Sequence, residues 1–203
     1  TGCYPNMVMN RLHRIKFDAN RAIGDAADGN PLVERAWYGY HAFIDSAKAH
    51  ITTTYGRGLF LDMHGHAHTI QRTELGYLLS SQQLRNSDAS INSSASVMAS
   101  SIRALVNDNT QGLSHVKLLR GTSSFGTLLE NEGFPAVPSQ SDPFPNHGES
   151  YFSGGYNTSQ HGSGNNNGYI DAIQIELNQD VRFNERTRTA LIKALAQIIV
   201  DYI

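Results

Sequence analysis

The sequence contains little cysteine, no excess of one charge and no long apolar run. Cys3 is the only cysteine in 203 residues, so no disulfide can form within the chain. The 16 basic and 18 acidic residues give a net charge of -2 without long runs of one sign, which argues against nucleic acid as the main partner. No apolar run approaches the roughly 20 residues that span a bilayer, and no basic-then-apolar leader stands at the start. We therefore expect neither a nucleic acid nor a membrane as a partner.

The remaining composition is typical of one folded domain. With 39% hydrophobic and 17% charged residues, residues 1–203 can bury one sizeable core. The chain begins at Thr1 rather than Met, from which we expect a processed chain, the larger C-terminal part of a longer precursor. Cys3 is most simply a small buried residue, but its place near this end also allows a disulfide to a second chain. These features do not indicate the cellular compartment of the protein.

The apolar pattern alternates between strand-like and helix-like segments. Short apolar runs predict strands at 5–10, 15–19, 59–63, 74–79 and 170–177. A spacing of three to four predicts helices from Pro31 to about 55, at 96–106 and 123–131, and a last helix capped by Asn184. This order predicts an α/β fold, a three-layer sandwich with a mixed, largely parallel central sheet flanked by helices. Residues 134–169, rich in Pro, Gly, Ser and Asn with interleaved aromatic residues, predict a long ordered loop that lines a site.

Polar residues stand at the ends of two of these strands. Asp62 and His64 are two positions apart and so face the same side of an extended strand, where a carboxylate can orient a metal-bound imidazole. Glu176 lies among Ile and Leu residues, and burial there would raise the pKa of its carboxyl toward that of a general base. A structural ion pair is the alternative role for Glu176. Because ligand groups in such sheets gather beyond the carboxyl ends of strands, we expect these residues to share a site.

The stretch LFLDMHGHAHT carries three histidines at alternating positions. His64 is the expected metal ligand because it follows both the strand and the aspartate, whereas His66 is a second-shell candidate and His68 a loop residue. Arg72 and Glu74 follow these histidines, and we expect a surface ion pair there.

The motifs FDANR, LDMHGH, a Gly/Tyr-rich loop and IQIELN, in this order, resemble the N-formylglutamate amidohydrolase family and, more distantly, the zinc carboxypeptidases that share its fold. The resemblance covers nearly the whole chain. It implies a zinc carboxypeptidase-like fold, a Zn²⁺ cofactor, and hydrolysis of an N-formyl, N-acyl or peptide-like amide by metal-activated water. By motif, His64 corresponds to a zinc ligand and Glu176 to the general base, with Asp18, Asp62 and His66 around the metal.

The same resemblance implies a substrate with a carboxylate, either a small molecule or a peptide. Asn20 and Arg21 correspond to the pair that binds this carboxylate. The other substrate-binding candidates are Arg14, Tyr156, His161 and Tyr169. The family's first two zinc ligands come from an earlier His-x-x-Glu type pattern, which does not precede FDANR here. We therefore expect a separate N-terminal chain to supply them, with Cys3 available for a link, unless the site is degenerate.

Two other interpretations remain open. An Asp-x-His-x-His sequence at a strand end is also typical of barrel-type amidohydrolases, but only about 135 residues follow it here, and a barrel needs roughly 200 or more. Alternatively, the chain is a non-catalytic binding or structural protein that retains the fold with a degenerate metal site.

Overall fold

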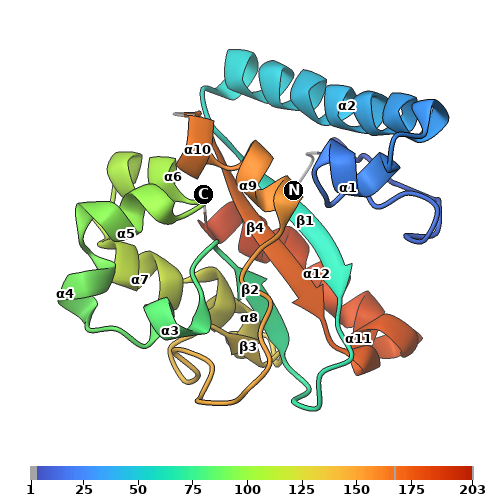
Figure 1. The fold of residues 1–203 in the computed structure, drawn as a ribbon. Coiled ribbons are helices and arrows are strands. Elements are labelled where there is room, and N and C mark those ends of the chain that lie inside the picture. Colours follow the sequence, from blue (N-terminus) through green and yellow to red (C-terminus); the bar gives the residue numbers. More distant parts are fainter. Residues whose placement is uncertain (1–3, 167, 203) are drawn as a thin grey trace.

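The computed structural model describes residues 4–166 and 168–202, so the expectation of a link through Cys3 lies outside the described residues. Within this part of the chain, four strands form one open sheet in the order β1-β4-β2-β3 (Figure 1). The strands are β1 (Gly58–Gly65), β2 (Thr73–Gly76), β3 (Ala136–Val137) and β4 (Ile170–Leu177). The β1–β4 and β2–β3 pairs are parallel, and the β2–β4 pair is antiparallel. The prediction of an α/β protein with a mixed, largely parallel sheet and helices is confirmed.

The helices of the described residues are mostly short, with two long exceptions at positions 31–55 and 185–202. In chain order they are α1 (Ile23–Ala27), α2 (Pro31–Tyr55), α3 (Ser81–Leu84), α4 (Asp88–Ile91), α5 (Ser94–Ala99), α6 (Arg103–Asp108), α7 (His115–Arg120), α8 (Phe125–Asn131), α9 (Tyr156–His161), α10 (Ser163–Asn166), α11 (Gln179–Phe183) and α12 (Glu185–Tyr202). No described helix is long and apolar enough to cross a membrane.

The two long helices begin where the sequence predicts. The side chain of Asn30 accepts the backbone N–H of Leu32 and Pro31 occupies the first turn, so α2 starts with a capped end and a preset φ angle. α2 ends at Gly56, whose φ of 78° is one that other residues rarely adopt. The side chain of Asn184 accepts the backbone N–H of Arg186 at 3.1 Å and caps α12.

The prediction of strands at 5–10 and 15–19 is wrong, because residues 4–22 form irregular backbone. Met7 and Ile15 in this segment are 77% and 83% exposed, and a strand needs a neighbour to satisfy its N–H and C=O groups. An alternating apolar pattern alone does not provide such a neighbouring strand.

The predicted helix at 96–106 is divided into α5 and α6 by two buried serines. The backbone N–H of Ser101 donates to the carbonyl of Tyr77, and the carbonyl of Ser101 accepts the N–H of Ala172. These bonds to two other segments replace bonds within a helix, which ends α5 at Ala99.

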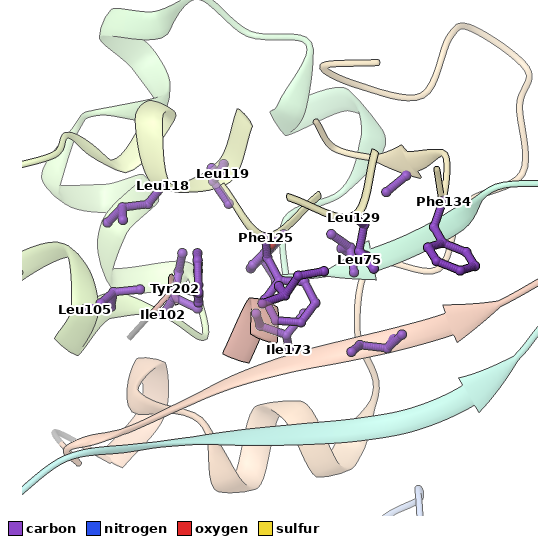
Figure 2. Close-up of a cluster of buried hydrophobic side chains, with 14 of the residues drawn as sticks. Leu75, Ile102, Leu105, Leu118, Leu119, Phe125, Leu129, Phe134, Ile173 and Tyr202 are labelled. Carbon is purple, nitrogen blue, oxygen red and sulfur yellow. The ribbon is translucent and has the colours of Figure 1, made fainter. Parts of the chain in front are cut away.

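The two faces of the sheet differ in chemistry because alternate side chains of a strand point to opposite sides. Leu75, Ile173 and Ile175 are fully buried in the main apolar cluster with residues of α8 and α12 (Figure 2). The residues between them along the strands carry carboxyl, imidazole and amide groups. α9 lies against β1 and β4 on this second face, where His161 contacts Phe60. The polar face is therefore the place for a functional site.

Candidate functional site

A row of titratable side chains crosses the polar face at the carboxyl ends of β1 and β4. His64 on β1 is the register partner of Glu176 on β4, and Glu176 in turn pairs with Glu74 on β2. One step back along the strands, Asp62 pairs with Gln174. All five residues face the same side because of the strand period of two. The sheet therefore brings together Asp62, His64 and Glu176, as the sequence predicts.

The ring of His64 is held between a carboxylate and an amide. Its Nε2 atom lies 2.9 Å from Oδ2 of Asp62 and 3.2 Å from Nδ2 of Asn20. Oδ1 of Asn20 accepts the backbone N–H of Asn157 at 2.7 Å, which turns the Asn20 amide so that its NH₂ group faces His64. Burial lowers the pKa of His64, but Asp62 and Glu176 outweigh this effect, so the pKa is raised.

The two Asp62 oxygens have different surroundings. Oδ1 accepts a hydrogen bond from the Asn157 side chain at 3.3 Å, whereas Oδ2 is buried and makes no well-directed hydrogen bond within the described residues. The close approach of this oxygen to Nε2 of His64 is thus a charge contact. A buried carboxylate oxygen and an imidazole nitrogen that converge in this way are two suitable donors for a cation.

Glu176 is buried, and only one side chain bonds it in the described part of the chain. Nε2 of Gln174 donates to its Oε1 at 2.9 Å. Burial, together with the negative charges of Glu74 and Asp62, raises the pKa of Glu176, against the opposing charge of His64. A buried carboxyl with a raised pKa next to an imidazole is a better proton acceptor than an ordinary surface carboxylate.

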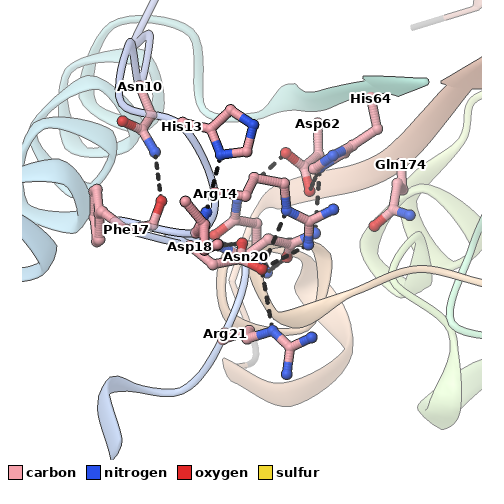
Figure 3. Close-up of polar contacts among 12 residues, drawn as sticks. Asn10, His13, Arg14, Phe17, Asp18, Asn20, Arg21, Asp62, His64 and Gln174 are labelled. Atoms are coloured by element: carbon pink, nitrogen blue, oxygen red, sulfur yellow. Dashed lines mark hydrogen bonds and ion pairs between the residues drawn. The ribbon is translucent and has the colours of Figure 1, made fainter. Parts of the chain in front are cut away.

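Two arginines border the site from the irregular N-terminal segment (Figure 3). Arg14 and Arg21 both bind Oδ2 of Asp18, at 2.6 Å and 3.0 Å. Burial raises the pKa of Asp18, but its bonds to these arginines outweigh that effect and the pKa is lowered. A surface hollow of roughly 760 Å³ is lined by all three residues and by α1. The hollow adjoins the arginines, and neither His64 nor Glu176 lines it.

A second group shares Glu74 of β2 with this row and adds His66 and His68 from the β1–β2 connection. His66, His68 and Glu74 each place a ligand atom within 4.8 Å of the other two, so that the group could hold a metal ion. Glu74 and Arg72 are buried, and the expected surface ion pair between them is wrong. Arg72 binds Asp142 at 2.7 Å, and Glu74 binds His68. Arg72 and Glu74 are therefore each held in place by a contact with a residue other than the expected partner.

The segment Ser153–Gly155 closes over the polar face. A Cβ atom on Gly76 would lie 2.5 Å from the backbone nitrogen of Gly154, so β2 and this segment touch backbone to backbone. A Cβ atom on Gly155 would lie 2.6 Å from Nδ2 of Asn20 and 2.9 Å from Oε1 of Gln174. Only glycine allows this approach.

The other predicted substrate-binding residues lie farther from the row. Tyr156 and His161 are on α9; Nε2 of His161 bonds Nδ1 of His41 at 2.9 Å, and Tyr156 packs beside Trp37. Tyr169 is 57% exposed at the start of β4, the strand end opposite to Glu176. The structure thus does not bring Tyr169 to the polar row.

Sequence reasoning missed three residues that contact the site: Tyr40, Asn157 and Gln174. Gln174 carried a readable signal, since it lies two positions before Glu176 and so shares its face. Asn157 comes from α9 and Tyr40 from α2, and the amide of Asn157 lies 3.4 Å from the hydroxyl of Tyr40. Nothing in their local sequence indicates this meeting.

The chain matches no known family profile, no curated protein and no solved structure.

Proposed function

We propose that the protein is a zinc-dependent amidohydrolase that cleaves an N-formyl, N-acyl or peptide-like amide near a substrate carboxylate. The observation that carries this proposal is the register pairing of His64 with Glu176 at the carboxyl ends of two parallel strands. The pairing brings the imidazole of His64 beside the buried carboxyl of Glu176, which supports the roles of metal ligand and general base that the resemblance to the zinc carboxypeptidase-like fold implies.

The donors at His64 suit zinc. Nε2 of His64 and Oδ2 of Asp62 converge at 2.9 Å, and imidazole and carboxylate are common zinc ligands. Bound there, the ion would polarise the scissile carbonyl and lower the pKa of a water molecule. Catalytic zinc commonly has three protein ligands, so the proposal includes a separate polypeptide segment that supplies the rest.

Glu176 acts as the base in this proposal. Its carboxylate takes one proton from the attacking water, whose oxygen bonds to the amide carbon, and delivers that proton to the leaving nitrogen as the C–N bond breaks. Gln174 donates to Oε1 of Glu176 and thereby fixes the direction of the carboxylate. The NH₂ group of Asn20 contacts Nε2 of His64, so zinc binding at Nε2 would replace this contact.

Arg14 and Arg21 provide positive charge for the substrate carboxylate. Their side chains are 66% and 58% exposed and share one aspartate, so N–H groups of each guanidinium are left for a ligand. Arg14 also acts electrostatically on His64, which places its charge near the proposed reaction centre. The proposal requires a substrate long enough to reach from these arginines to Glu176, which does not line the hollow beside them.

Hydrolysis of N-formyl and N-acyl amino acids, measured with added Zn²⁺ and with chelator, tests the proposal. We expect zinc-dependent release of the free amino acid, which chelation abolishes. A zinc-loaded protein that hydrolyses none of a broad set of amides and esters would contradict it and would favour the second candidate, a non-catalytic binding protein. The number of metal ligands supports that candidate. Within residues 4–166 and 168–202, only His64 and Asp62 converge as metal donors beside Glu176, whereas catalytic zinc commonly has three protein ligands.

A further inference from the structure

We propose that His66, His68 and Glu74 form a second binding site, for a divalent transition-metal ion such as Zn²⁺ or Co²⁺, separate from the His64–Asp62 pair. The three ligand atoms lie within 4.8 Å of one another, and His66 and Glu74 are buried. Tetrahedral coordination at about 2.0 Å needs ligand atoms roughly 3.3 Å apart, so rotations of the side chains by small angles would close the group around an ion.

His66 is oriented in advance as a ligand. Its Nε2 atom lies 2.8 Å from the backbone carbonyl of Arg72, which can only accept, so the ring proton is on Nε2 and the lone pair on Nδ1. Histidine ligands of metals commonly donate their other N–H in this way. The lone pair of Nδ1 accepts the backbone N–H of His68 at 3.0 Å, and an ion would exchange this hydrogen bond for a coordinate bond.

The side chains of Glu74 and His68 are already in contact. Oε1 of Glu74 lies 2.7 Å from Nδ1 of His68, while Oε2 accepts the backbone N–H of Phe152 at 2.8 Å. Oε1 is thus the oxygen available to an ion. On coordination the ring proton of His68 would move from Nδ1 to Nε2, so the histidine stays neutral and no proton is lost.

The donor set selects the class of ion. Two imidazole nitrogens and one carboxylate suit Zn²⁺, Co²⁺ or Ni²⁺, whereas Ca²⁺ and Mg²⁺ require about six oxygen ligands. The side chain of His68 is 22% exposed, which leaves a route for the ion and a place for a water ligand. The Phe152 ring stacks on His68 at 4.7 Å. An ion would therefore tie the β1–β2 connection to the segment that crosses the polar face.

The two sites are separated by a strand. His64 is on β1 and Glu74 on β2, with β4 between them. The ligand atoms that cluster within 4.8 Å of one another belong to His66, His68 and Glu74, and this cluster includes neither His64 nor Asp62. The second site therefore does not depend on whether the proposed hydrolase activity exists.

Titration of the 203-residue chain with Co²⁺, followed by visible absorbance and calorimetry, tests the second site. We expect that Glu74→Gln and His68→Ala each weaken one Co²⁺ binding event by at least about tenfold, while His64→Ala retains it. His13→Ala, at an exposed histidine, serves as the matched control. Glu74→Gln keeps the shape of the side chain, and thermal unfolding confirms that each variant is folded.

Three outcomes would overturn the second site. The first is a folded parent chain that binds no Co²⁺. The second is unchanged binding in both Glu74→Gln and His68→Ala. The third is loss of every binding event in His64→Ala, which would place the ion at His64. None of these measurements uses amide hydrolysis, so failure of the proposed function leaves this test intact.

Discussion

Glu74 on β2 and Glu176 on β4 are direct partners across an antiparallel strand pair, and both carboxyl groups are buried. Each has its own imidazole neighbour: His68 contacts Glu74, and His64 is the register partner of Glu176 on β1. Two facing carboxylates disfavour double ionisation, so burial and Glu74 together raise the pKa of Glu176. This pairing therefore contributes to the raised pKa of Glu176, the proposed base.

Glu176→Gln is expected to reduce kcat for amide hydrolysis by about 10²-fold or more, because the amide cannot accept the proton of the attacking water. Stability should be unchanged or slightly increased, since a buried carboxyl beside Glu74 is removed. Steady-state kinetics and urea unfolding measure the two effects. Glu132→Gln, at an exposed position, is the control. A Glu176→Gln protein with normal kcat would exclude Glu176 as the base.

Arg21→Ala and Arg14→Ala are expected to raise KM for substrates that carry a free carboxylate by roughly 10-fold or more, because a charge-assisted hydrogen bond is lost. The same variants should bind the corresponding carboxamide substrates as the parent protein does. Kinetics on each acid and its amide, measured side by side, separate the two cases. An equal change in KM for both would assign the arginines a structural role only.

Gly155→Ala should impair activity more than stability. Its new methyl group would push against Asn20 and Oε1 of Gln174, the residues that orient His64 and Glu176. We expect kcat/KM to fall by at least about tenfold, as a misplacement near 1 Å can cost more than that. Gly39→Ala, in α2 with open space around it, is the control and should stabilise the protein by about 0.5–1 kcal/mol. Equal activity in both variants would show that Gly155 does not position the site.

The sequence alone predicted the elements whose signal is local. Pro31 at the start of α2, the apolar runs of β1 and β4 and the cap at Asn184 need no other part of the chain to be recognised. The division between α5 and α6 depends on bonds from Ser101 to Tyr77 and Ala172, far along the chain. In the same way, His64 and Glu176 could be picked as strand-end residues, whereas the contacts of Asn157 and the burial of Glu74 depend on tertiary packing.

Asp171 should make the protein less stable as the pH rises. Burial raises the pKa of its carboxyl to about 6, against hydrogen bonds from Ser163 and from the backbone of Leu105 and Ala104. The folded state prefers the protonated form, so this stability is fully present below about pH 4 and lost as the pH rises through 6. The loss amounts to about 3 kcal/mol. Relative to Asp171→Asn, the parent should lose that amount between pH 4 and 7 in urea unfolding; a constant difference would contradict the assignment.

The ionisation of His161 should change the stability of the protein in the opposite direction over the same pH range. Burial, Lys48 and His41 lower the pKa of its imidazole to about 4, against the charges of Asp45 and Asp62. The folded state prefers the neutral ring, so this stability is present above about pH 6.5 and is lost as the pH falls toward 4.

The two effects largely cancel in the parent protein, and single variants expose them. His161→Gln, whose amide can still bond His41, should become more stable as the pH falls toward 4, because only the contribution of Asp171 remains. Asp171→Asn should steepen the loss of stability on the acid side, because the opposing contribution of the carboxyl disappears. Urea unfolding of both variants and the parent at pH 4, 5.5 and 7 provides the comparison. If both variants change stability with pH in the same direction, either Asp171 ionises normally in the folded protein or His161 does.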